Sequence, residues 1–159
     1  MSRETKDDVL RRLIYETRAS QAATERFDAL AAEALGINRT DAACLDVIDN
    51  EGGVLTAGRV AELSGLTTAA VTAVLDRLEA KGYAKRVRDE RDRRRVLVEL
   101  TPLLRRRTEE IWGPLGAEGT RAMQRLTLDE LRTVTDFVRF SRELNERHAE
   151  RIRGLRFGA

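Results

Sequence analysis

Apolar residues recur with helical spacing along most of the chain, while two short runs near the middle alternate between apolar and polar positions. The helical pattern starts near Lys6 and continues to Leu35, where Gly36 follows as a helix-ending glycine. The alternating runs predict two neighbouring strands, 83–88 and 96–100. Helical spacing also predicts further helices, namely 41–50, two short helices on either side of Gly65, and the segments after Thr101 and Thr127. The pattern therefore predicts a mainly α protein with a small β-hairpin.

The stretch Arg59–Leu78 contains the two short helices, which meet at Gly65 because a glycine adopts a positive φ without a Cβ clash. Apolar residues fall on one shared side of these helices, and three threonines lie on the far side of the second: Thr67, Thr68 and Thr72. This is the layout of a helix-turn-helix, whose second helix enters the DNA major groove. An ordinary helical hairpin has the same pattern, so the stretch by itself leaves both interpretations open.

Basic residues gather in the predicted hairpin. Residues 85–95 hold seven Lys or Arg and three Asp or Glu, a local net charge of +4, although the whole chain carries only +2. A charged hairpin tip is commonly a solvated loop. Its position directly after the candidate recognition helix instead favours a wing, whose arginines reach phosphates and the minor groove. We therefore predict DNA contacts by Arg91, Arg93 and Arg94, with Asp92 holding Arg94 by a charge-assisted hydrogen bond.

The residues needed for catalysis or metal binding are scarce in this sequence. Cys44 and His148 are the only cysteine and histidine, and Gly-rich phosphate-binding loops are absent. We expect no metal, no cofactor and no enzyme, and we expect Cys44 to be a buried core residue and not a redox sensor. The charged N-terminus resembles no signal peptide, and no apolar run is long enough to span a bilayer, so a cytoplasmic protein without membrane contact is expected.

The terminal helices predict a dimerisation region. The apolar start of the first helix, 9–14, is interpreted as a dimer interface, with packing inside the monomer as the alternative. Near Gly113 a kink or break is expected because Pro114 disfavours helix at the preceding residue. Thr127 and Glu130 form a capping box that opens the last helix. The predicted organisation is a helical dimerisation region, 1–36 with 102–159, around a DNA-binding domain, 37–101.

Three segments carry a resemblance to a known family: Leu78-Glu79-Ala80-Lys81-Gly82-Tyr83, Asp92-Arg93-Arg94 and Val98-Glu99-Leu100-Thr101. With the order of elements, they resemble the MarR (multiple antibiotic resistance regulator) family of bacterial winged helix-turn-helix transcription factors. The resemblance implies an obligate homodimer that binds a pseudo-palindromic operator in double-stranded DNA and often responds to a small-molecule or oxidant signal. Matched position by position, it places Thr67, Thr68, Thr72 and Arg77 at the major groove and its phosphates, and Arg94 in the minor groove.

Two positions depart from the family pattern. Ala73 stands where many members carry a larger polar or basic residue, so base recognition would depend on threonine hydroxyls and methyls. The peroxide-sensing branch uses a cysteine in its first helix, whereas Cys44 lies in the second. The function expected is a dimeric, sequence-specific repressor released by a small-molecule effector. A winged-helix scaffold protein that does not bind DNA specifically is the alternative that Ala73 leaves open.

Overall fold

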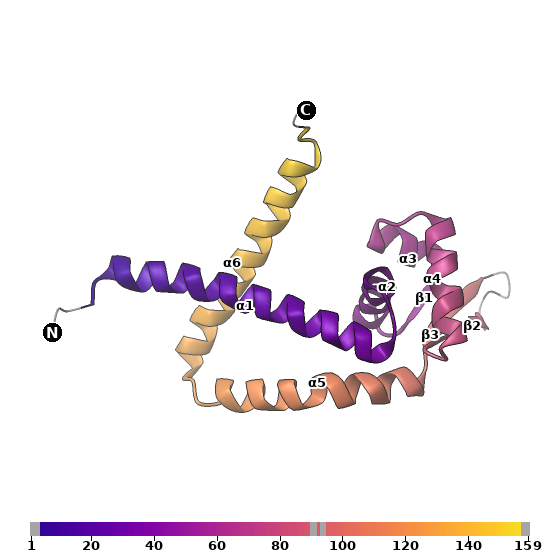
Figure 1. The fold of residues 1–159 in the computed structure, drawn as a ribbon, viewed down its shortest axis with the longest axis horizontal. Coiled ribbons are helices and arrows are strands. Elements are labelled where there is room, and N and C mark those ends of the chain that lie inside the picture. Colours follow the sequence, from indigo (N-terminus) through magenta and orange to yellow (C-terminus); the bar gives the residue numbers. More distant parts are fainter. Residues whose placement is uncertain (1–3, 90–91, 93–94, 157–159) are drawn as a thin grey trace. The chain divides into compact units, whose positions relative to one another are not determined.

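A computed structural model describes residues 4–89, 92 and 95–156. Within these residues the chain forms helices and three strands (Figure 1). The helices are α1 (Lys6–Leu35), α2 (Arg39–Asn50), α3 (Ala57–Ser64), α4 (Thr68–Ala80), α5 (Pro102–Met123) and α6 (Leu128–Arg153). The strands are β1 (Val54–Thr56), β2 (Ala84–Arg88) and β3 (Val96–Leu100). The predicted class, mainly α with a small β-hairpin, is confirmed.

Capping interactions determine where the helices begin and end. The Thr5 hydroxyl accepts a hydrogen bond from the Asp8 N–H, and the Asp8 carboxylate accepts one from the Thr5 N–H, so this reciprocal pair starts α1. Gly36 ends α1 with a φ of 64°, as predicted. Side chains also cap the later helices: Asn38 begins α2, Thr56 begins α3 and Thr67 begins α4. The predicted capping box of Thr127 and Glu130 begins α6.

The two predicted strands pair as an antiparallel hairpin and recruit a third strand. The sheet order is β1-β3-β2, with Val98 of β3 opposite Leu55 on one side and Arg86 on the other. Val98 is fully buried, so the central strand attaches the sheet to the core. The N–H of Asp89 donates to the Arg95 carbonyl at 3.1 Å and continues the pairing of the two strands by one hydrogen bond beyond their ends.

The core lies between α2, α3, α4 and the sheet, which packs against α4 through β2. Its fully or almost fully buried apolar side chains are Cys44, Ile48, Val60, Val71, Val74, Leu75, Leu78, Tyr83 and Val98. Cys44 is therefore the core residue that the sequence predicted. Burial raises the pKa of its thiol, and the negative charge of Asp41 raises it further, so the thiol stays protonated at neutral pH.

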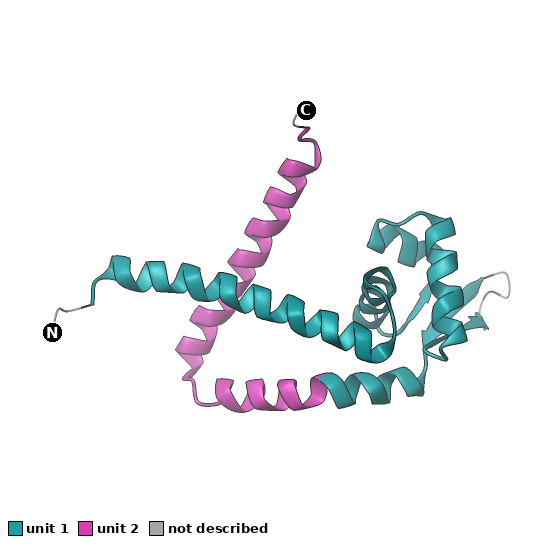
Figure 2. Cartoon of the chain, viewed as in Figure 1, with its two compact units in different colours: residues 1–111 teal, residues 112–159 magenta. Residues whose placement is uncertain are grey.

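The contacts divide the chain into two compact units, residues 1–111 and 112–159 (Figure 2). The boundary falls within α5, close to the point where a kink or break was expected. The helix continues through Pro114 to Met123, so the break is wrong. A proline inside a helix removes one N–H donor and crowds the carbonyl four residues earlier. The remaining hydrogen bonds of this 22-residue helix evidently outweigh that loss.

Tyr83 joins three parts of the first unit. Its hydroxyl is buried and donates to the Leu35 carbonyl at the end of α1, at 2.9 Å. Arg107 of α5 donates to the same hydroxyl and lies over the Tyr83 ring, 5.4 Å from its centroid. Tyr83 thereby connects the turn between α4 and β2 to the end of one long helix and the start of another.

We expect Tyr83→Phe to lower the free energy of unfolding by about 1–2 kcal/mol, because the Leu35 carbonyl loses its donor in a buried position. Urea denaturation measures this change. Tyr15→Phe is the matched control, since Tyr15 is exposed, and should change the value by less than about 0.5 kcal/mol. Equal effects of the two substitutions would contradict the role of the Tyr83 hydroxyl.

Candidate nucleic-acid interface

The predicted threonine face lies on the outer side of α4. The turn between α3 and α4 is made by Gly65, whose φ is 69°. Thr67 caps α4, since its hydroxyl oxygen accepts the Ala70 N–H at 3.2 Å. Thr68, Thr72 and Ala73 are exposed. The structure thus brings the three predicted threonines together at the N-terminal half of one helix, where a recognition helix leads into the major groove.

The hydrogen bonds of these threonines determine what they can offer a ligand. The Thr72 hydroxyl donates to the Thr68 carbonyl at 2.9 Å, so its free capacity is as an acceptor, beside an exposed methyl group. The Thr67 hydroxyl accepts from the backbone, so its proton is available for donation. These are groups that contact phosphates, amino groups of bases or a thymine methyl.

Arg77, near the end of α4, is held by a buried carboxylate. Its Nε and Nη2 donate to Oδ1 of Asp41 at 3.1 and 2.5 Å, and Asp41 is only 2% exposed. Asp41 also accepts the Asn38 N–H at 3.4 Å, so one carboxylate both caps α2 and binds α4. The hydrogen bond to Asp41 raises the pKa of the Arg77 guanidinium, which remains charged in any case.

This ion pair was not foreseen from the sequence, although a signal for it exists. Asp41 shares a helical face with the buried residues Cys44, Leu45 and Ile48, so its side chain points inward and needs a partner. The Arg77 side chain is 45% exposed and uses two of its five N–H donors on Asp41. The remaining donors make no hydrogen bond to another described residue, which leaves them available to a phosphate, the role that the family resemblance implied.

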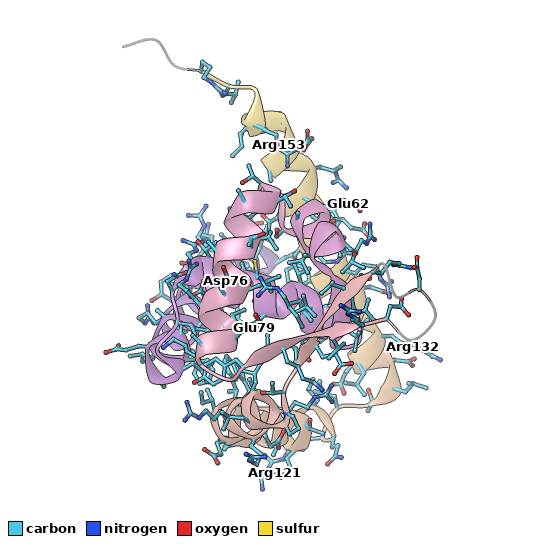
Figure 3. All side chains as sticks on the ribbon, turned by 90° about the vertical axis from the view of Figure 1, so that its right-hand side faces the viewer. Glu62, Asp76, Glu79, Arg121, Arg132 and Arg153 are labelled. Atoms are coloured by element: carbon cyan, nitrogen blue, oxygen red, sulfur yellow. The ribbon has the colours of Figure 1, made fainter. Side chains whose placement is uncertain are left out.

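A second set of ion pairs joins β2 to α4. Arg86 of β2 places Nη2 at 2.8 Å from Oδ1 of Asp76 and donates through Nη1 to Glu79. The backbone N–H of Arg86 also donates to Glu79, at 2.7 Å. Asp76 and Glu79 both lie on α4, which faces the viewer beside the sheet in Figure 3. Burial works against the charged guanidinium, but the carboxylates of Asp76 and Glu79 outweigh it and raise the pKa of Arg86.

The predicted wing arginines, Arg91, Arg93 and Arg94, lie outside the described residues, as does the expected contact between Asp92 and Arg94. Asp92 itself is exposed, and its backbone carbonyl accepts the Arg95 N–H at 2.8 Å. At the base of the hairpin, Lys85 of β2 pairs with Glu99 of β3 at 2.7 Å.

Other kinds of site find little support in the described part of the chain. Among residues 4–89, 92 and 95–156, no group of three or more His, Cys, Asp or Glu side chains is placed to hold a metal ion. Within the same residues no helix combines the length and apolar character that crossing a membrane requires. A groove of about 430 Å³ beside β1 and α3 is lined by Arg59, Glu62 and Arg95 among others, and Arg59 is paired with Glu62 at 2.7 Å.

A helix-turn-helix followed by a paired β-hairpin defines the winged helix-turn-helix class. Comparison with family models matches residues 35–95 to the MarR family. A curated relative, the uncharacterized HTH-type transcriptional regulator YcgE of Bacillus subtilis, is 35% identical over 130 residues, 82% of this chain and 84% of the relative. The chain belongs to the MarR family of transcriptional regulators. It is therefore classed with regulators and not with enzymes.

Solved structures share this fold. A MarR family protein from Bacillus stearothermophilus has a TM-score of 0.59 and 21% identity, over 92% of this chain and 99% of that one. The MepR protein of S. aureus, solved as a complex with DNA, has a TM-score of 0.59 and 19% identity, over 83% and 97%. At these identities the likeness concerns the fold.

We expect Arg77→Gln to lower the midpoint of thermal unfolding by about 5 °C, because it leaves the Asp41 carboxylate buried without a cation. Adding Asp41→Asn should recover part of this loss, since the neutral amide retains a capping oxygen. Arg139→Gln is the control: it removes an exposed pair with Asp136 and should shift the midpoint by less than about 1 °C. A double variant no more stable than Arg77→Gln would contradict this interpretation.

Proposed function

We propose that this MarR-family chain is a homodimeric, sequence-specific DNA-binding repressor that a small-molecule effector releases from its operator. The observation that carries the proposal is the threonine face of α4, whose Thr67, Thr68 and Thr72 are exposed and which is followed directly by a basic hairpin. Helix and hairpin are attached to one core, so both would engage the same stretch of double-stranded DNA.

We assign a DNA contact to each part of the surface formed by α4 and the hairpin. Thr67, Thr68 and Thr72 would meet base edges and phosphates in the major groove, and Arg77 would contact a phosphate with its free donors. The hairpin arginines, Arg91, Arg93 and Arg94, would reach the backbone and the minor groove, with Asp92 orienting Arg94. The phosphate contacts would supply most of the affinity, and the threonine hydroxyls and methyls would recognise the bases.

Dimerisation is proposed because the long helices expose apolar surface. In the N-terminal third of α1 the apolar side chains Val9, Leu10, Leu13 and Ile14 are all exposed. Helix α6 likewise exposes Leu128, Val134, Phe137, Val138, Phe140 and Ile152. Apolar rows of this kind are typical of surfaces that a second protein covers. We therefore propose that 1–36 and 102–159 form the dimerisation region and 37–101 the DNA-binding domain, with a pseudo-palindromic operator that mirrors the two-fold axis.

The repressor role and the effector rest on the family resemblance. An effector that binds more tightly to the DNA-free form weakens operator binding, and bound operator weakens effector binding by the same factor. The alternative proposal is a winged-helix scaffold that does not bind DNA specifically. It is favoured by Ala73, which is exposed and offers α4 no polar group at a position suited to base reading.

We expect the protein to bind a labelled duplex from the region beside its own gene, and we expect Arg94→Ala to weaken this binding about tenfold through loss of a minor-groove contact. Fluorescence anisotropy in the presence of unrelated competitor DNA measures the affinity. Arg132→Ala, which removes an exposed arginine from α6, is the matched control and should leave the affinity unchanged. Binding that competitor DNA abolishes, or that Arg94→Ala leaves intact, would favour the scaffold.

We expect Leu13→Glu to raise the dissociation constant of the homodimer about a hundredfold or more, because the interface would bury an unpaired charge. Analytical ultracentrifugation over a concentration series measures this constant. Tyr15→Glu is the control, because Tyr15 is exposed on the side of α1 opposite the apolar row. A dimer that tolerates Leu13→Glu as well as Tyr15→Glu would argue against α1 as part of the interface.

A further inference from the structure

The exposed side of α4 carries a carboxylate in line with the threonines. Thr68, Thr72 and Asp76 follow one another at intervals of four residues, so they occupy one side of the helix. The Asp76 side chain is 61% exposed. DNA presents about one phosphate charge per 1.7 Å of its axis, so an uncompensated carboxylate on this row would repel it.

The helix cannot neutralise this charge by itself. Within α4 the charged residues are Asp76, Arg77 and Glu79, two acids and one base. The Arg77 guanidinium already faces the buried carboxylate of Asp41. Both acids of α4 therefore depend on a cation from another element.

Arg86 of β2 is that cation. Its Nη2 lies 2.8 Å from Asp76, its Nη1 donates to Glu79, and Nη2 also lies 3.5 Å from the Thr72 carbonyl, beside the exposed row. Arg86 is only 31% exposed, so its side chain is turned toward α4 and away from solvent. One guanidinium thus pairs with both carboxylates and lowers the negative charge that they would otherwise present to a nucleic acid.

We infer that Arg86 is a positioning residue for DNA binding, which acts by pairing with Asp76 and Glu79 and so lowering the negative charge of α4 where it would enter the major groove. This inference rests on the proposed function. It differs from a direct phosphate contact, because the guanidinium acts through two carboxylates of the recognition helix. It also differs from a purely structural role, because the backbone N–H of Arg86 bonds to Glu79 whatever the side chain is.

The test is a double-mutant cycle with a labelled operator duplex, read by fluorescence anisotropy. We expect Arg86→Gln to weaken binding about tenfold, the effect of about 1.4 kcal/mol of repulsion. Adding Asp76→Asn should restore the affinity to within about threefold of the wild type, whereas Asp76→Asn alone should change it less than about threefold. Arg86→Lys keeps the charge and should also remain within about threefold.

Lys85→Gln is the matched control for charge, since it removes one cation from the same strand, paired with Glu99 instead of α4. Adding Asp76→Asn to Lys85→Gln should change the operator affinity by the same factor by which Asp76→Asn changes the affinity of the wild type. The thermal unfolding of each variant is measured as well, to show that it is folded. If Arg86→Gln does not fold, the inference is tested with Arg86→Lys.

Three outcomes would overturn the inference. A double variant as weak as Arg86→Gln would mean that Arg86 contacts DNA itself, and Arg86→Lys as weak as Arg86→Gln would mean that only its geometry counts. Strong loss of affinity from Asp76→Asn alone would make Asp76 a base-reading residue.

The proposed function and the inference can fail separately. A wild-type protein that binds no duplex would refute the proposed function along with the inference. If the wild type binds but Asp76→Asn does not rescue Arg86→Gln, the inference alone is refuted.

Discussion

The placement of helix α4 depends on the ion pair between Asp41 and Arg77. A carboxylate that is 2% exposed is stable only with a charged, hydrogen-bonded partner, and Arg77 provides one from near the C-terminal end of α4. Because Asp41 also caps α2, the position of α4 is tied to the start of another core helix. The exposed face of α4 is therefore presented at a defined angle, which a helix that reads DNA requires.

Arg86 acts on the other side of the same helix. It joins β2 to α4 through Asp76 and Glu79, so α4 is held by charged groups from α2 on one side and from the hairpin on the other. The two arrangements differ in exposure: Asp41 is buried and chiefly stabilises the fold, whereas Asp76 is exposed where a ligand would approach. The same kind of interaction can thus serve stability in one place and binding in the other.

Local rules predicted much of this architecture. Gly36 and the Thr127 capping box marked helix ends correctly, because capping involves residues a few positions apart. The links from Asp41 to Arg77 and from Arg86 to Asp76 were missed, because periodicity carries no information on which charged groups meet across elements. Of the kink or break expected near Gly113, the break was wrong for a related reason: the local preference against helix before Pro114 was outweighed by the many hydrogen bonds of a long helix.

We propose that two copies of α4, one from each protomer, read one operator. Hydroxyl-radical footprinting on DNA beside the protein's own gene tests it most directly. The result predicted is a pair of protected segments on one face of the duplex, with centres roughly 10 bp apart or at a multiple of that spacing and with related sequences. Protection spread evenly along the DNA, and lost at modest salt, would contradict sequence-specific binding by a dimer.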